Sequence, residues 1–165
     1  MEMADSVTFK FEGFQEFTAM VNEIREDFGE KDAKNIMNKA MRLAMEPVLS
    51  LARNLVPVDS GALQDSLRIE ARKPTSKDKH SRYVNATDVV IATVTTAPAS
   101  AMKKKGFNDF KPDFRALAME FGTAKIPGGK PFLRPALEGQ SQAATNVLTD
   151  SLRTVLERYK SKYNK

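Results

Sequence analysis

Residues 32–56 limit the possible folds of this chain more than any other stretch. Their apolar side chains recur at spacings of three and four residues for about seven helical turns, which predicts a long amphipathic helix. Pro47 lies inside this stretch and has no amide hydrogen to donate, so we expect a kink between residues 43 and 47. Pro57 ends the helix, because a residue that precedes proline is pushed away from helical backbone angles.

Three strands are predicted. Polar and apolar residues alternate over residues 7–12 and 67–71, as in half-buried strands. Residues 89–95 are rich in β-branched side chains and would pair with the 67–71 strand as a hairpin. Residues 72–82 are highly charged and lack periodicity, which fits the solvated tip of that hairpin.

Two further helices complete the pattern. Residues 14–28 carry one apolar stripe, and Gly29 is expected to end their helix. A C-terminal helix begins near residue 133 and runs to about residue 163. Residues 114–121 fit either a strand or a short helix. The predicted fold is α+β, with a small antiparallel sheet on which a long kinked helix and a C-terminal helix pack.

The chain is expected to form a single domain over residues 1–165, since its length suits one domain and it shows no internal repeat. Two long basic loops are expected, at about residues 72–88 and 97–113. Loops of this length are usually functional or become ordered only on binding. Residues 122–130 are predicted to form a hinge-like loop. They are not expected to bind a nucleotide, because their Gly-Gly-Lys sequence lacks the spacing of a phosphate-binding loop.

The composition excludes several kinds of site. The chain has 26 Lys and Arg residues against 21 Asp and Glu, a net charge of +5, and no cysteine, which excludes disulfides and thiolate chemistry. The single histidine, His80, cannot supply a His-pair metal site and would be the only base for a Ser-His-Asp triad. No stretch reaches the ~18 apolar residues of a membrane span. We therefore expect a soluble protein made in the cytoplasm, with no membrane partner and no catalytic, cofactor or metal site.

Asp59 and Glu120 are the carboxylates in the most unusual settings. They could act as a general acid and base, or bind a hard cation. The more ordinary interpretation is structural: Asp59 lies in a turn and Glu120 at the edge of an element, where backbone amides need acceptors. We favour the structural interpretation.

The two basic loops are candidates for contacts with a protein partner or with the DNA backbone. They lack interleaved aromatic residues, and no recognition-helix motif is present, so protein contact is favoured over sequence-specific DNA binding. Incidental contact with DNA phosphates stays open. The candidate residues are Lys77, Lys79, Arg82, Lys103, Lys104 and Lys105.

Two stretches are more specific than composition. The first is Asn-Leu-Val-Pro-Val-Asp-Ser-Gly-Ala-Leu-Gln-Asp-Ser-Leu at residues 54–67. The second is Ala-Met-Glu-Phe-Gly-Thr at 118–123, followed by Lys-Pro-Phe-Leu-Arg-Pro-Ala-Leu at 130–137. In order and spacing they resemble the minor tail components, also called tail-completion or head–tail joining proteins, of long-tailed double-stranded DNA phages. Ser60 stands where that family usually has threonine, which keeps the hydroxyl group.

The resemblance implies a non-enzymatic virion protein of the tail or neck. Such a protein assembles as a homo-oligomeric ring, expected to be a hexamer, at the head-proximal end of the tail. Its expected partners are the tail terminator or tail tube protein on one side and the head connector or stopper protein on the other, with non-specific contact to genomic DNA open. The interface candidates are Pro57, Asp59, Ser60, Gly61, Leu63, Glu120, Phe121, Gly122, Thr123, Pro131, Phe132, Leu133, Arg134 and Pro135.

Physical reasons explain these residue types. Gly61 permits a backbone conformation that a side chain would forbid. Phe121 is expected to be an aromatic anchor, and the residues after Pro131 supply a stiff start to the last helix with Phe132 as an apolar plug. Arg134 could form a forked bond to a carboxylate of the same or a neighbouring subunit, with Glu120 as our candidate partner.

Three alternatives remain open at this level. The protein could be a tail terminator ring, which would share a similar small α+β fold. It could be a small DNA-binding protein that uses its basic loops, in which case its affinity should fall steeply with salt. A hydrolase that uses Asp59 and Glu120 is the least favoured.

Overall fold

The structure is a computed structural model that describes residues 14–81, 84–85, 88 and 90–163. Its α-helices and strands, in chain order, are α1 (Phe14–Ala44), α2 (Glu46–Leu55), α3 (Ala62–Ser66), β1 (Leu67–Arg72), β2 (Ile91–Thr96), α4 (Ala99–Lys104), α5 (Pro112–Phe121) and α6 (Leu133–Tyr163), with a 3₁₀ turn at Asp78–His80. The predicted strand at 7–12 and the candidate Arg82 lie outside the described residues.

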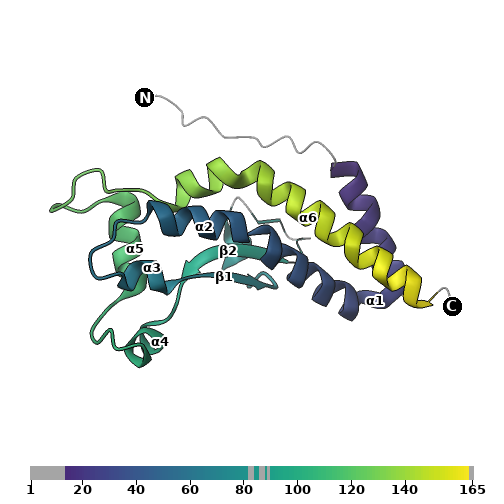
Figure 1. The fold of residues 1–165 in the computed structure, drawn as a ribbon, viewed down its shortest axis with the longest axis horizontal. Coiled ribbons are helices and arrows are strands. Elements are labelled where there is room, and N and C mark those ends of the chain that lie inside the picture. The colour runs from purple at the N-terminus through teal and green to yellow at the C-terminus, as the bar shows by residue number, and fades with distance from the viewer. Residues whose placement is uncertain (1–13, 82–83, 86–87, 89, 164–165) are drawn as a thin grey trace.

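Strands β1 and β2 form the predicted antiparallel hairpin, in a register that runs from Leu67 opposite Thr96 to Arg72 opposite Ile91. The alternation of β1 places Leu67 and Ala71 on the buried side, where α1 and α2 pack. The α+β fold class is thereby confirmed: a two-stranded sheet carries a long bent helical layer, and α6 packs along that layer (Figure 1).

Both predicted breaks in the helical layer are present. Gly29 has φ 73° and ψ 168° inside α1, so two helical segments meet there at a sharp bend. The 32–56 helix is divided at Met45, which separates α1 from α2. Pro47 then lies in the first turn of α2, where an amide hydrogen has no helical acceptor in any case. The kink therefore places the proline where it costs least.

Helix α6 crosses both hydrophobic core clusters. Near its start, Ala136 belongs to a cluster with buried side chains of α2, α3, β1 and α5. Further along, Leu152 and Leu156 pack with Ile24 and Ile36 of α1 in a second cluster. One polar helix with a narrow apolar stripe thus holds the two halves of the helical layer together.

The segment from residue 97 to 113 is more ordered than the sequence predicts. It contains α4, which is anchored by Met102, a side chain with no exposed surface. The rings of Phe107 and Phe110 lie 6.5 Å apart. The prediction of one long loop here is wrong. Met102 is the buried residue that holds α4 in place, and the charged residues around it give no helical pattern in the sequence.

The ambiguous 114–121 stretch is helical. Helix α5 begins at Pro112, and Pro112, Ala116 and Glu120 are its buried residues, four apart. This spacing brings all three onto the side of the helix that faces the core. Glu120 is thus a buried carboxylate on the inner side of α5.

Candidate functional site

The two sequence motifs meet at one end of the molecule, which we call the motif end. It comprises the turn 57–61, α5, the loop 122–131 and the start of α6, on the left in Figure 1. A groove of about 250 Å³ lies between the turn and α5, and its lining includes Asp59, Arg115 and Lys130. Segments at least 50 residues apart in the chain therefore form one surface, as the spacing of the motifs alone could not show.

Glu120 caps the last helix from a distance. Its Oε2 accepts hydrogen bonds from the amides of Phe132 and Leu133, and its Oε1 from the amide of Arg134, each at 3.0 Å. Phe132 is the residue before α6, and Leu133 and Arg134 are its first two residues, so none of these amides has an acceptor within the helix. The carboxylate also lies at the positive end of the helix dipole. The structural interpretation of Glu120 is confirmed.

The predicted pairing of Glu120 with the Arg134 guanidinium is wrong within the chain. Arg134 donates its backbone amide instead, and in the described residues its side chain forms no ion pair with Glu120. A double variant with exchanged charges, Glu120→Arg with Arg134→Glu, is therefore not expected to restore what either single substitution disrupts. An ion pair of Arg134 with a neighbouring subunit remains a hypothesis.

The loop after α5 is closed rather than hinge-like. Thr123 and Ile126 exchange backbone hydrogen bonds at 3.0 Å, and the Lys130 amide donates to the Met119 carbonyl at 2.7 Å. Gly122 has φ 83°, and a Cβ there would lie 2.7 Å from the amide nitrogen of Gly129. Both ends of the loop are thus in contact through backbone atoms, which requires glycine at Gly122.

The 57–61 turn follows its prediction in part. Gly61 has φ 76° at the residue before α3, as expected for a left-handed position. The Ser60 hydroxyl accepts a long hydrogen bond, 3.4 Å, from the amide of Ala62. Asp59 is exposed, and in the described part of the chain its carboxylate accepts no hydrogen bond, so the predicted turn bond is absent. Leu63, by contrast, is buried in the core.

A polar network supports this turn, and sequence reasoning missed it. The Arg53 guanidinium donates to the Leu67 carbonyl, and the Gln64 amide donates to the Arg53 carbonyl, each at 2.8 Å. The buried Ser66 hydroxyl donates to the Leu63 carbonyl at 2.7 Å. These bonds tie α2, α3 and β1 together across the turn, a role that no local spacing indicates.

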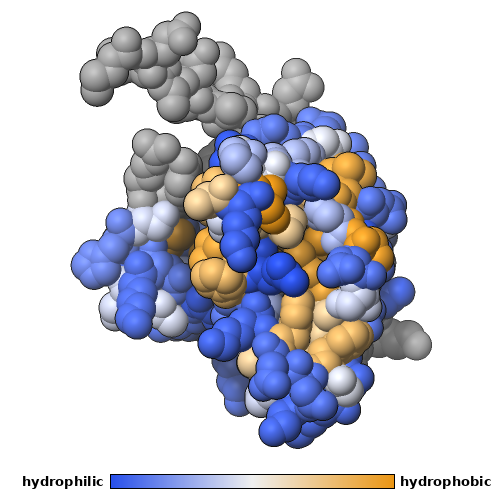
Figure 2. Space-filling model, turned by 90° about the vertical axis from the view of Figure 1, so that its left-hand side faces the viewer, coloured by the Kyte–Doolittle hydropathy of each residue, from blue (hydrophilic) through white to orange (hydrophobic). Residues whose placement is uncertain are grey.

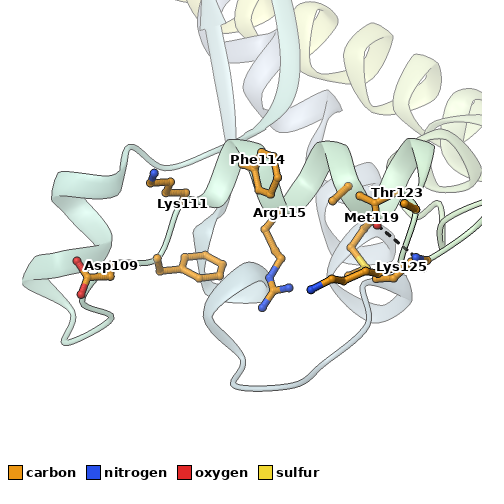
Figure 3. A pocket seen from close by; sticks show the side chains of 11 residues that line it. Asp109, Lys111, Phe114, Arg115, Met119, Thr123 and Lys125 are labelled. Atoms are coloured by element: carbon orange, nitrogen blue, oxygen red, sulfur yellow. Dashed lines mark hydrogen bonds between the residues drawn. The ribbon is translucent and has the colours of Figure 1, made fainter.

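A second, larger groove of about 550 Å³ also has Arg115 in its lining. It is formed by residues 109–111, α5 and the loop that follows, and its lining includes Phe114, Met119 and Ile126. Figure 3 shows the charged ends of Arg115 and Lys125 pointing toward each other across this groove. The site is therefore an open, largely apolar hollow with cationic groups at its edge.

Three large apolar side chains of α5 are exposed at the motif end: Phe114 (69%), Leu117 (58%) and Phe121 (67%). Their spacing places them on one side of the helix, opposite the buried Ala116 and Glu120. Phe121 is thus not an anchor for its own chain, contrary to the prediction, whereas Phe132 is fully buried. Figure 2 faces this end and shows apolar areas interrupted by hydrophilic side chains.

The basic candidates lie in two separate places. Lys77 and Lys79 are exposed in the β1–β2 loop. That loop is ordered by Asp78, which accepts two hydrogen bonds from the Arg72 guanidinium, at 2.6 and 3.1 Å, and two more from Thr75. The hydrogen bond with Arg72 is the largest contribution that keeps the pKa of Asp78 well below its usual range.

The second basic group lies at the end of α4. Lys103 and Lys104 form its last turn, which suits the negative end of a helix dipole. Lys105 donates to the Asp65 carbonyl at 3.1 Å and so joins α4 to the end of α3. A contact of these lysines with DNA or protein stays a prediction.

No group of three or more His, Asp or Glu side chains in the part of the chain that the structure describes could hold a metal ion. None of the helices described there is both long and apolar enough to cross a membrane.

Comparison with known protein families matched residues 18–110 to the family described as "Bacteriophage HK97-gp10, putative tail-component". The matched residues contain the 54–67 motif, and the 118–137 stretch lies beyond them. Comparisons with curated proteins and with solved structures gave no significant match. The resemblance to a phage tail component family is thereby confirmed. Because the match covers more than half of its residues, this chain belongs to the HK97-gp10-like family of bacteriophage tail components.

Proposed function

We propose that the protein is a non-enzymatic structural component of the virion that forms a ring at the head-proximal end of the tail. The ring would join the tail tube or terminator to the head connector. Membership of a tail component family supports a structural role in the tail. The observation that carries the proposal is the motif end, where Phe114, Leu117 and Phe121 are exposed beside an open groove. Such contiguous apolar surface commonly marks a protein–protein interface.

The state of the two candidate catalytic carboxylates supports a role without catalysis. Glu120 is buried, and three backbone amides occupy its oxygens. Asp59 lies in an exposed turn. A general acid–base pair needs carboxylates that can reach a reacting group. Glu120 could do so only by breaking its hydrogen bonds with the amides at the start of α6.

The experiment that tests the proposal is imaging of the neck in purified particles of the encoding phage, at side-chain resolution. The expected result is a closed ring of this chain between tail tube and connector, with the motif end at subunit contacts. Deletion of the gene should leave filled heads and tails that do not join. A particle that lacks the chain would contradict the proposal, and a ring that ends a tail with no connector bound would indicate the terminator role.

DNA binding is separated from this role by its salt dependence. If Lys103, Lys104 and Lys105 act by contact with phosphates, the logarithm of the affinity should fall with the logarithm of salt concentration, by about 0.9 for each phosphate contacted. A purified chain with no such slope would leave the protein contacts as the function of the motif end.

A further inference from the structure

We propose that the exposed side of α5 binds the N-terminal end of a second copy of this chain, so that copies associate head to tail. We call this surface, formed by Phe114, Leu117 and Phe121, the α5 face. The inference rests on the proposed ring and names the two surfaces that would join neighbouring subunits. Two features of the described residues carry it: the chemistry of the α5 face and a complementary stripe on α1.

The α5 face is apolar at its centre and open at its side. Each of its three side chains exposes more than half of its surface. Phe114 also lines the groove of about 550 Å³, so the face continues into a hollow. No described residue covers this area. An occupant must therefore offer apolar groups to both the face and the groove.

The rim of the α5 face is basic. Lys111, Arg115 and Lys125 line the groove, and in the described residues none of them forms an ion pair. Asp109 is the acidic residue in the lining, and the nearby Glu120 carboxylate is already bound by amides. The rim thus favours an occupant that carries carboxylates beside its apolar groups.

The N-terminal end of the chain has this chemistry. Residues 1–32 hold nine acidic and three basic residues, although the whole chain has a net charge of +5. Four of the ten phenylalanines fall within residues 9–17. An aromatic, acidic segment is what the apolar face and its basic rim would select.

The described part of α1 presents the acidic groups on one side. Glu23 lies three and four residues before Glu26 and Asp27 in the segment of α1 that precedes the bend at Gly29, so the three residues share one side of that segment. Glu26 and Asp27 are exposed, whereas Glu30 lies beyond the bend, 4.0 Å from Lys34. We call Glu23, Glu26 and Asp27 the acidic stripe. It directly follows the aromatic segment, so both components of the occupant come from one continuous stretch.

The two surfaces lie at opposite ends of the molecule. In Figure 1 helix α5 is at the left, and the first half of α1 is at the right. Helix α6 begins beside α5, and Leu152, about 30 Å further along the helix, packs with Ile24 of α1 in the second core cluster. A contact between two different surfaces of identical copies is heterologous, and it closes into a ring if the rotation between copies allows.

Charge reversal tests the contact in the purified full-length chain. One variant carries Arg115→Glu and Lys125→Glu, and a second carries Glu26→Lys and Asp27→Lys. Sedimentation equilibrium should show that the association constant of each variant alone falls by about tenfold or more, because like charges then face each other. An equimolar mixture should restore it to within about threefold of the wild type, since every interface in the mixture can again pair opposite charges.

The matched control is Lys73→Glu with Lys77→Glu, which changes the net charge as the first variant does but lies in the β1–β2 loop. Its association constant should stay within about twofold of the wild type. A mixture that associates no better than either variant alone would overturn the inference.

Cross-linking distinguishes this contact from other ring contacts. The chain has no cysteine, so each introduced one is unique. Ala124→Cys lies in the lining of the large groove, Ala19→Cys is exposed on α1, and Ala99→Cys is an exposed control on α4. Oxidation should join the Ala124→Cys and Ala19→Cys chains to each other, and should not join Ala99→Cys to Ala19→Cys.

The outcomes separate the two proposals. A chain that forms rings in particles but gives no Ala19–Ala124 cross-link would overturn the head-to-tail contact and leave the proposed ring intact. A variant that carries both Ala19→Cys and Ala124→Cys should also be oxidised at low protein concentration. A cross-link within one chain under that condition would overturn the head-to-tail contact as well. A chain absent from particles and monomeric in solution would overturn the ring and this contact together.

Discussion

Glu120 and Phe132 are joined by a hydrogen bond of 3.0 Å between a side-chain oxygen and a backbone amide, across twelve residues of chain. The Phe132 side chain has no exposed surface and packs in the core cluster at the motif end. Phe132 thus holds the chain in place through its buried ring and donates its backbone amide to the Glu120 carboxylate. The direction in which α6 leaves α5 is therefore set by this pair.

Glu120→Ala should destabilise the fold by about 2–4 kcal/mol, because it leaves three amides of the α6 start without their acceptor. Urea unfolding measures the change. Glu138→Ala, which removes an exposed carboxylate from α6 itself, is the matched control and should change the free energy of unfolding by less than about 0.5 kcal/mol. Equal effects of the two variants would contradict the cap.

Gly122→Ala should cost about 2 kcal/mol or more. Its Cβ would lie within 2.9 Å of three backbone atoms of the loop, and its φ of 83° is unfavourable for alanine. Gly128→Ala isolates the second effect, because Gly128 has φ 76° but open space around it, and it should cost about 1 kcal/mol. Thermal unfolding of both variants tests the difference, and a smaller loss at Gly122 than at Gly128 would be inconsistent with the closed loop.

Two phenylalanines should respond in opposite ways. Phe132→Ala should lower the free energy of unfolding by about 3–5 kcal/mol, since it opens a cavity in the core. Phe121→Ala should change the stability of the isolated chain by less than about 0.5 kcal/mol, because two thirds of its surface is already exposed. The second variant should nevertheless reduce assembly, which sedimentation measures. Phe121→Ala with unchanged assembly would remove this side chain from the proposed interface.

The β1–β2 loop should resist acid. The pKa of Asp78 is lowered in the folded chain by its bonds with Arg72 and Thr75, so these bonds stabilise the loop fully above the ordinary pKa of an aspartate. Their contribution should begin to fall only below about pH 4 and should disappear as the pH passes the lower pKa of the folded state. Carboxyl chemical shifts measured by NMR would follow the titration.

Arg72→Gln is the control for this titration. It removes the guanidinium that is the main cause of the lowered pKa, so the Asp78 titration should move toward ordinary values. Hydrogen exchange at the amide of Thr75, which donates to Asp78 at 2.6 Å, should become faster at neutral pH. An unchanged titration in this variant would show that Arg72 does not hold the carboxylate.

Assembly variants need the same separation of stability from function. The charge-reversing substitutions lie at exposed positions. The unfolding transitions of these variants should therefore match that of the wild type, while their association constants differ from it. A variant that both unfolds earlier and associates less would say nothing specific about the interface, and it would be replaced by the cysteine pair.

The sequence by itself determined the elements that depend on local rules. The apolar spacing of residues 32–56 and 133–163 specifies helices, and Pro47 and Gly29 specify where the helical layer bends. The alternation around Leu67 specifies the hairpin strand. Each of these follows from backbone geometry within a few residues, so neighbours far along the chain are not needed to decide it.

Only the tertiary structure decided what the motif residues contact. Glu120 could have paired with the Arg134 guanidinium or with the amides of the next helix start, and the packing of Phe132 selects the amides. Phe121 could have been buried, but Pro112 and Ala116 take the inner side of α5 and leave it outside. These outcomes depend on which side of a helix meets the core, and that is settled by contacts between residues distant in sequence, which no local pattern contains.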